Sequence, residues 1–436
     1  MNNEHTISLV NERDKRMSGL IKDINSLAFI KEKCEEKLNA YFPAGVPDFV
    51  RERYEQELQY IKEYGGADAL RLYYELSVLA KEHNSLIASR GMGHNLFIRF
   101  LLGNAPIDPL NAYRYCPNCG YAEQIKDVAF GIDAPAKNCP VCGESLLARG
   151  YSLYPVFVWG GSTEKMPYGV DADDYQCPTR IYSLFAERIK ELYIDNQVVP
   201  WLSSINDGEE KARRAGFWIL PKGKNLQKDF PQFVVHDENG STCADGWLYE
   251  VSDHGIQVIY LCHSQLLDKI ERVPGNEDDN CIGTIEEKIA NVTAAELIKT
   301  GLLEEDEVAA LQAMPATTRF QLTESLAEAR NSFGNLGNAP WKESPYSLDT
   351  NKSFYTRETL YERLLKLGLT EIESYKVATF VRKGKAASKF SRQEWNQMVN
   401  AYSFPEEFVN YCQKYRYLYR RGDVLDRLRL LAICIR

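Results

Sequence analysis

The sequence lacks several features that would place it in a broad class at once. No run of apolar residues approaches the ~18 that a membrane helix requires. The segment from Met1 to Arg16 has neither the apolar core nor the cleavage site of a secretory signal. The chain also lacks the basic excess of a general nucleic-acid coat, because its formal net charge is −9. We therefore expect no membrane partner, and any polyanion would have to bind to a local basic region.

Cysteine is present, but not in the arrangement of a secreted disulfide scaffold. Of the 11 cysteines, seven are scattered without regular spacing: Cys34, Cys177, Cys243, Cys262, Cys281, Cys412 and Cys434. An odd, unpatterned set of this kind is typical of a reducing compartment. With 436 residues, 44 % of them hydrophobic and 26 % charged, the chain is expected to be a soluble cytoplasmic protein of two or three domains.

The other four cysteines form two C-x-x-C knuckles, Cys116 with Cys119 and Cys139 with Cys142. Each knuckle contains Pro and is followed directly by Gly, which favours a tight turn that aims two thiolates at one point. Two such turns predict a tetrahedral site for Zn²⁺, with two disulfides or an iron–sulfur cluster as the alternatives. Four thiolates leave no open position for water, so a zinc ion there would be structural.

Hydrophobic periodicity predicts helices at both ends of the chain and strands between them. An i, i+4, i+7 series that starts at Tyr54 predicts a helix from about Arg51. It is preceded by one or two helices and a Pro-rich break and followed by helices at 67–82 and 96–102. Strand-like runs follow at 154–159, 217–220, 232–235, 247–251 and 256–261, with a helix at 179–192, and beyond an acidic linker at 274–280 the chain reads as helical. This order predicts an α+β fold.

Two kinds of segment are candidates for binding phosphate. The turn Ser89-Arg90-Gly91 precedes a helix, whose N-terminus could hold a phosphate, although a plain turn is the simpler interpretation. Basic residues also collect in 376–395 and 411–436, where tyrosines alternate with Lys and Arg. Single-stranded nucleic acid is bound by such mixtures, through phosphate contacts and base stacking. The alternative is a helix whose tyrosines are buried and whose arginines face water.

The order of these motifs resembles one family, the PolC type of replicative DNA polymerase III alpha subunit. The similar segments are Arg53–Lys62, Ser89–Gly91, Asp108–Cys119, Asp133–Gly143, Lys165–Pro167, Leu336–Ala339, Val381–Lys385 and Lys414–Arg421. The resemblance covers about residues 50 to 436, and the knuckles and V-R-K-G-K are its most specific parts.

The resemblance implies a truncated palm–zinc–fingers core. The expected palm is a mixed β-sheet with helices at 49–273, after a helical extension at 1–48. It carries the zinc module at 113–145 and a reduced thumb-like insertion at 175–212, and an all-helical fingers-like domain follows at 281–436. The exonuclease, PHP and C-terminal oligonucleotide-binding regions of the family are not expected. Residues implied to bind nucleotide or DNA are Ser89, Arg90, Arg213, Arg214, Arg382, Lys383, Lys385, Lys414, Arg416, Arg420 and Arg421.

The sequence departs from the family where the polymerase reaction needs carboxylates for two Mg²⁺ ions. Tyr168 and Val170 stand at the positions of the family's D-I-D pair, and Ile259 replaces the third acid. A shifted pairing would recruit Asp171 and Asp173, with Asp253 or Asp268 in place of the third acid. Further departures are Met92, His94 and Asn95 after the S-R-G turn, Arg213-Arg214-Ala215-Gly216 for H-P-G-G, and Arg421-Gly422-Asp423 for K-A-H.

Three hypotheses follow. The favoured one is a pseudoenzyme that has lost polymerase activity and acts as an accessory or inhibitory factor. Its partner would be DNA, as primer–template or single strand, or a replisome protein. The second is an active DNA polymerase that binds Mg²⁺ through Asp171 and Asp173. The third is a zinc-stabilised interaction protein that does not bind nucleic acid, which the acidic net charge favours.

Overall fold

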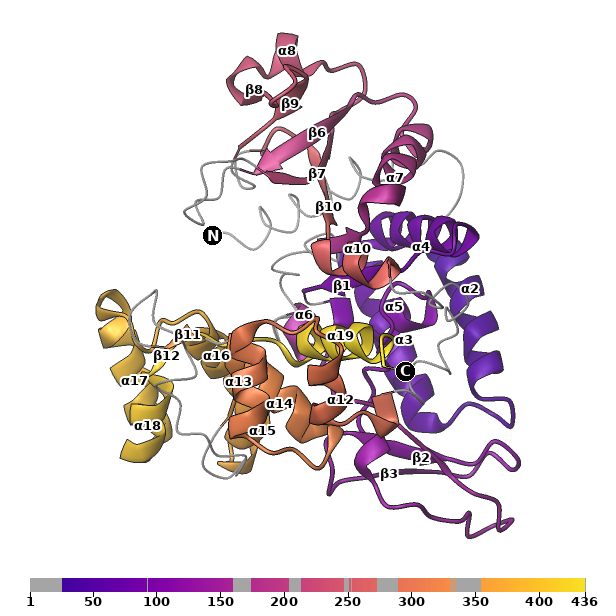
Figure 1. Cartoon of the computed structure of the whole chain (residues 1–436), viewed down its shortest axis with the longest axis vertical. Coiled ribbons are helices and arrows are strands. Elements are labelled where there is room, and N and C mark those ends of the chain that lie inside the picture. The colour runs from indigo at the N-terminus through magenta and orange to yellow at the C-terminus, as the bar shows by residue number, and fades with distance from the viewer. Residues whose placement is uncertain are drawn as a thin grey trace.

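The computed structural model describes residues 26–91, 93–159, 174–203, 213–246, 251, 253–272, 289–330, 332–333 and 354–435. Within these segments the chain combines one seven-stranded mixed sheet with many helices (Figure 1), which confirms the predicted mixture of sheet and helix. None of the helices in the described residues is long and apolar enough to cross a membrane.

The first described helices pack against one another. They are α2 (Ser26–Tyr41), α3 (Asp48–Tyr64), α4 (Ala67–Glu82) and α5 (Phe97–Leu101). The side chains of Tyr54 and Ile61 on α3 are buried, as the spacing of apolar residues predicted. They pack in one cluster with Leu38 of α2 and Phe100 of α5.

The sheet has the strand order β1-β5-β10-β7-β6-β9-β8. The strands are β1 (Ala88–Arg90), β5 (Asp174–Cys177), β6 (Val198–Ser203), β7 (Arg213–Ile219), β8 (Val234–His236), β9 (Thr242–Ala244) and β10 (Gln257–His263). Strands β5 and β10 run parallel, with Leu261 paired to Tyr175, and β7 lies antiparallel to β10 on its other side.

Successive side chains of β10 point to opposite faces of the sheet and so belong to two different hydrophobic cores. Ile259 and Leu261 point to the face covered by α4 and α7 (Thr179–Leu192), where they join a cluster with Tyr73 and Phe185. On the opposite face, Val258 and Tyr260 pack against a second cluster.

Helices dominate the rest of the chain. They are α6 (Val156–Trp159), α8 (Leu226–Asp229), α10 (Gln265–Glu271), α12 (Ala294–Lys299), α13 (Glu305–Ala313), α14 (Arg319–Arg330), α15 (Arg357–Lys366), α16 (Glu371–Arg382), α17 (Arg392–Tyr402), α18 (Glu406–Cys412) and α19 (Arg421–Ala432). The C-terminal region is not all helical as predicted, because β11 (Ser332–Phe333) pairs with β12 (Tyr415–Tyr417).

Two further local predictions are wrong. The strand-like run at 154–159 forms helix α6, whose four residues are all buried. A segment buried on every side has no apolar period that separates helix from strand. Ser89 and Arg90, predicted in a turn, lie on strand β1, and the chain leaves the strand at Gly91, where φ is +121°. The strand-like run at 247–251 lies almost wholly outside the described residues.

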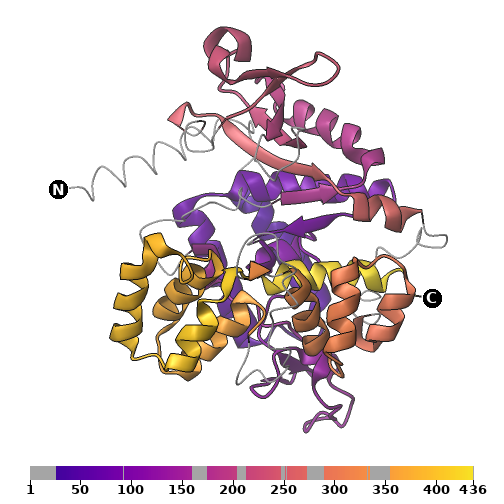
Figure 2. The same ribbon diagram turned by 60° about the vertical axis from the view of Figure 1, so that its left-hand side comes forward.

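Helix α19 returns the chain to the sheet. In Figures 1 and 2 it lies between β1 and helices α12 to α14. Leu430 and Ile433 at its end pack against Ala88 of β1 and Leu267 of α10. The last described helix therefore connects the sheet to the C-terminal helices.

Arg421, the first residue of α19, is fully buried at this junction. Its guanidinium donates two hydrogen bonds to the Glu362 carboxylate, at 2.7 and 3.0 Å, and one to the Ser152 carbonyl, at 3.0 Å. It also lies over the rings of Phe130 and Phe320. Although burial lowers it, Glu362 outweighs that effect and raises the pKa of Arg421, so the guanidinium stays charged.

We predict that Arg421→Met destabilises the protein by about 3–5 kcal/mol, because it removes the fully buried partner of the half-buried Glu362 carboxylate. Urea unfolding followed by circular dichroism measures this loss. The control is Lys222→Met at the exposed pair with Asp195, which should cost less than about 1 kcal/mol. Equal midpoints for the two variants would contradict the structural role of Arg421.

Candidate functional site

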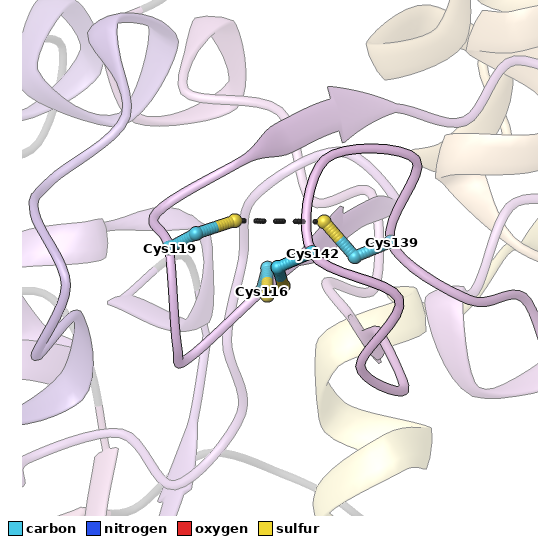
Figure 3. A group of neighbouring side chains, drawn as sticks. All are labelled: Cys116, Cys119, Cys139 and Cys142. Atoms are coloured by element: carbon cyan, nitrogen blue, oxygen red, sulfur yellow. Dashed lines mark hydrogen bonds between the residues drawn. The ribbon is translucent and has the colours of Figure 1, made fainter.

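The sulfur atoms of Cys116, Cys119, Cys139 and Cys142 all lie within 4.8 Å of one another (Figure 3). The Cys116–Cys142 and Cys119–Cys139 sulfurs are 3.4 and 3.5 Å apart. A disulfide would need about 2.05 Å, whereas thiolates ~2.3 Å from one tetrahedral zinc ion lie roughly 3.8 Å apart. This four-Cys cluster could therefore hold a metal ion such as zinc.

Each knuckle is closed by the glycine that follows it. The Gly120 N–H donates to the Cys116 carbonyl at 3.0 Å, and the Gly143 N–H donates to the Cys139 carbonyl at 2.9 Å. The φ angles of the two glycines are +77° and +80°, in the region that favours Gly. The same short motif thus makes the same turn twice.

The thiols of the cluster differ in how readily they lose their protons. A backbone hydrogen bond from Glu144 lowers the pKa of Cys142 to about 6. The Tyr121 N–H likewise lowers the pKa of Cys119, but burial and the neighbouring sulfurs outweigh it and raise that pKa to about 12. Four thiolates in one place repel one another, so complete deprotonation requires a positive charge among them.

The cysteine module is attached to the N-terminal helices. Its strands β2 (Tyr113–Tyr115), β3 (Ala122–Gln124) and β4 (Leu147–Arg149) form a separate sheet in the order β3-β2-β4. The Ala44 N–H donates to the Tyr115 hydroxyl at 2.8 Å, and the Phe42 ring packs edge-on against Tyr115. The cysteine module therefore packs against the break between α2 and α3.

The expected catalytic acids fall outside the described residues. Asp171, Asp173, the Lys165–Pro167 segment, Tyr168 and Val170 all belong to 160–173. The structure therefore leaves the shifted D-x-D pairing as a prediction.

The structure describes Ile259, the residue that the resemblance places at the third acid, and this residue is apolar. Ile259 is 2 % exposed, pairs with Phe217 of β7 and faces the layer of α4 and α7. Its side chain has no atom that can bind a metal ion. Sequence alignment alone could not show that this position points into a hydrophobic core.

The two suggested replacements for that acid are placed differently. Asp268 lies on α10 and accepts hydrogen bonds from the Thr179 N–H and hydroxyl, at 2.8 and 2.9 Å, and it lies 2.5 Å from the His263 ring. Asp253 is exposed before β10. Within the part of the chain that the structure describes, only the four cysteines bring three or more Cys, His, Asp or Glu ligand atoms together.

The Ser89-Arg90-Gly91 segment makes internal contacts. The Ser89 N–H donates to Asp426 at 3.0 Å, and the Gly91 N–H donates to Asp423 at 2.7 Å. Ser89 is buried and Arg90 is exposed. Two carboxylates of α19 therefore accept the hydrogen bonds of backbone N–H groups that the sequence analysis suggested for binding a phosphate.

The predicted basic residues fall into two groups. Arg421 is buried in the junction described above, and Arg382 is 8 % exposed and donates to the Tyr417 hydroxyl at 2.6 Å. The half-buried Arg420 lies 3.4 Å from Asp423. The interpretation of these arginines as a water-facing helix surface is therefore wrong.

The second group lies on the surface. Lys383, Lys385 and Lys414 are exposed, whereas Arg416 is half-buried and donates to the Ala387 carbonyl at 3.2 Å. Arg213 and Arg214 lie on β7, and their side chains fall outside the described residues.

Several residues near these groups were not found from the sequence. Arg357 and Glu358 form a buried ion pair at the start of α15, and Arg357 also stacks on Phe157. Phe390, between α16 and α17, is fully exposed beside Lys389. No sequence motif marks Arg357 and Glu358, because Arg357 contacts a ring from a distant part of the chain. No motif marks Phe390 either, because its position on the surface is set by the fold.

Comparisons with known proteins agree with the motifs. A sequence model described as "Bacterial DNA polymerase III alpha NTPase domain" matches residues 28–138. The protein named "DNA polymerase III PolC-type" from Thermotoga maritima is 23 % identical to this chain and covers 87 % of it. The protein of that name from Bacillus subtilis is 22 % identical and covers 90 % of the chain. A match to the Streptococcus sanguinis protein is 32 % identical but covers 32 % of the chain and 10 % of that relative.

The chain spans 31 % of the length of the Thermotoga and Bacillus relatives. The resemblance read from the motifs is confirmed: this chain is similar to proteins named "DNA polymerase III PolC-type" along about nine tenths of its own length.

Proposed function

We propose that this chain is a PolC-like protein that has lost polymerase activity and acts on DNA or a replisome protein as an accessory or inhibitory factor. In this proposal residues 49–273 form a palm-like domain with a reduced thumb-like insertion, and 281–436 form a fingers-like domain. The observation that carries the proposal is Ile259, an apolar residue in a hydrophobic core at the position of a metal-binding acid.

The chemistry explains why this position matters. Two Mg²⁺ ions about 3.5–4 Å apart need bridging carboxylates to offset their mutual repulsion. Asp171 and Asp173 keep a D-x-D spacing, and on a strand both side chains would project to the same face, which favours the alternative of an active polymerase. A third acid is then still required, and Asp268 already accepts hydrogen bonds from Thr179.

Primer extension tests the loss of activity. We expect no template-dependent extension above background with Mg²⁺ or Mn²⁺, and no change in any measured property when Asp171 and Asp173 are both changed to Asn. Extension that the double variant abolishes would overturn the inactive assignment and establish the active alternative.

We further propose that the four cysteines hold one structural Zn²⁺. With all four ligand positions filled by sulfur, the ion would leave no site for a reacting water. The free energy of zinc binding would stabilise the knuckles. Through the hydrogen bond between Ala44 and Tyr115, it would also stabilise the chain just before α3.

Elemental analysis of protein purified without chelator should give one zinc atom per chain. Cys119→Ser should remove most of this zinc and lower the melting temperature, because binding free energy at such a site is folding free energy. The half-buried Cys434, outside the knuckles, provides the control Cys434→Ser, which should keep the metal. Wild-type protein without bound metal would contradict the zinc assignment.

DNA is proposed to bind at the exposed loop between α16 and α17. Lys383, Lys385 and Lys389 are exposed there, Arg392 is exposed at the start of α17, and the ring of Phe390 is fully exposed among them. Lysines neutralise phosphates, and an exposed ring offers a stacking surface for a base. Arg382 and Arg421 are excluded from this surface because they are buried.

Changing Lys383, Lys385 and Lys389 together to Gln should weaken DNA binding and reduce the slope of log K against log salt by about 2–3 for duplex DNA. Fluorescence anisotropy across a salt series measures both quantities. The matched control changes the exposed Lys190, Lys222 and Lys228 to Gln.

An unchanged slope in the loop variant would locate DNA binding elsewhere. A wild-type protein that shows no salt-dependent DNA binding would instead favour the third hypothesis, a zinc-stabilised interaction factor.

A further inference from the structure

A cleft of about 340 Å³ lies where helix α3 meets the start of the cysteine module. Its volume is within the range of roughly 300–1,000 Å³ in which proteins bind small molecules. Its α3 residues have the i, i+3, i+4, i+7 spacing of a single helix face, and they are Phe49, Glu52, Arg53 and Gln56. Asn111 and Gln124, the last residue of β3, also line the cleft.

The guanidinium of Arg53 is fixed beside this cleft. Its Nε donates to the Glu57 carboxylate at 2.6 Å, and its Nη2 donates to the Asn95 carbonyl at 2.7 Å. Glu57 is itself fully buried and accepts hydrogen bonds from the Phe97 and Ile98 N–H groups at the start of α5, at 3.0 and 2.9 Å. Within the described residues Nη1 of Arg53 has no hydrogen-bond partner, so an oriented donor remains for a ligand.

The charges at the cleft suit a neutral ligand better than a phosphate. Glu57 neutralises Arg53, and the exposed Glu52 forms no ion pair within the part of the chain that the structure describes. Two carboxylates therefore stand against one guanidinium, and like charge disfavours an anion. Carboxamides, which both donate and accept, are exposed around these groups on Gln56, Asn111 and Gln124.

We propose that this cleft binds a guanine base. Guanine presents the acceptor O6 beside two donors, N1–H and N2–H, on one edge. Nη1 of Arg53 donates to O6, and the Glu52 carboxylate accepts from N1–H and N2–H. The half-buried ring of Phe49, which packs edge-on against Tyr113 with 5.6 Å between centroids, provides an apolar surface for the base.

Three purine nucleotides test this assignment by isothermal titration calorimetry on the full chain. Guanosine monophosphate should bind at least about tenfold more tightly than inosine monophosphate, which lacks the N2 amino group, and than adenosine monophosphate. Adenine would place the acceptor N1 against the Glu52 carboxylate. Because all three probes carry the same phosphate, differences in affinity report contacts to the base.

Glu52→Gln should weaken the binding of guanosine monophosphate about tenfold and remove the preference over inosine monophosphate, because a carboxamide offers one acceptor oxygen and not two. The matched control is Glu55→Gln, since Glu55 is exposed on the same helix but does not line the cleft. The control should keep both the affinity and the preference. Both glutamates are exposed, so neither substitution should affect folding.

The guanine could come from a free nucleotide or from a single strand, and competition separates these sources. An oligothymidine that contains one guanine is compared with pure oligothymidine as a competitor of guanosine monophosphate. Competition by the guanine-containing strand alone assigns the cleft to a base within a strand. Competition by neither strand assigns it to the free nucleotide.

The inference is overturned if the wild type does not bind guanosine monophosphate, or binds the three nucleotides equally. Equal losses of affinity in Glu52→Gln and Glu55→Gln would also overturn it. It does not rest on the proposed function, because Lys383, Lys385 and Lys389 do not line the cleft. The variant with these three lysines changed to Gln should therefore keep its guanosine monophosphate binding whatever its affinity for DNA.

Discussion

A single buried guanidinium at the start of α19 links the C-terminal helices to the segment that follows the cysteine module. Arg421 joins Glu362 of α15 to the carbonyl of Ser152, which follows the cysteine module. A charge in this position is stable only with its partners in place, because an unpaired buried charge is costly. The position of α19 follows from this contact, and with it the positions of Asp423 and Asp426 against β1.

The cysteine module is ordered by local turns and not by a buried ion pair. Its two turns are local and identical in design, and each depends on one glycine with positive φ. The sulfurs converge because both turns are attached to the same three-stranded sheet, and Tyr115 connects that sheet to the chain before α3. A metal ion bound there would stabilise a loop that has little hydrophobic core of its own.

Two departures from the polymerase pattern affect charge in opposite senses. By the resemblance described above, Ile259 stands where the family has an acid, and Asp423 stands where the family has the histidine of K-A-H. In the function proposed above, the first weakens the binding of metal ions. Both changes preserve packing, since Ile259 fills a core and Asp423 satisfies Gly91 and Arg420.

The sequence by itself determined the features that depend on neighbouring residues: the two knuckles, the amphipathic helices α3 and α7, and the family resemblance. It was wrong for 154–159, because burial on all sides leaves no local period, and it left open which arginines of the basic tyrosine-rich segment face water. Only the tertiary structure decided that Arg382 and Arg421 are internal while Lys383 and Lys385 face water. It also decided that Asp423 meets Gly91, 332 residues earlier in the chain. Such contacts depend on how α19 packs against β1, and no spacing within either segment encodes that packing.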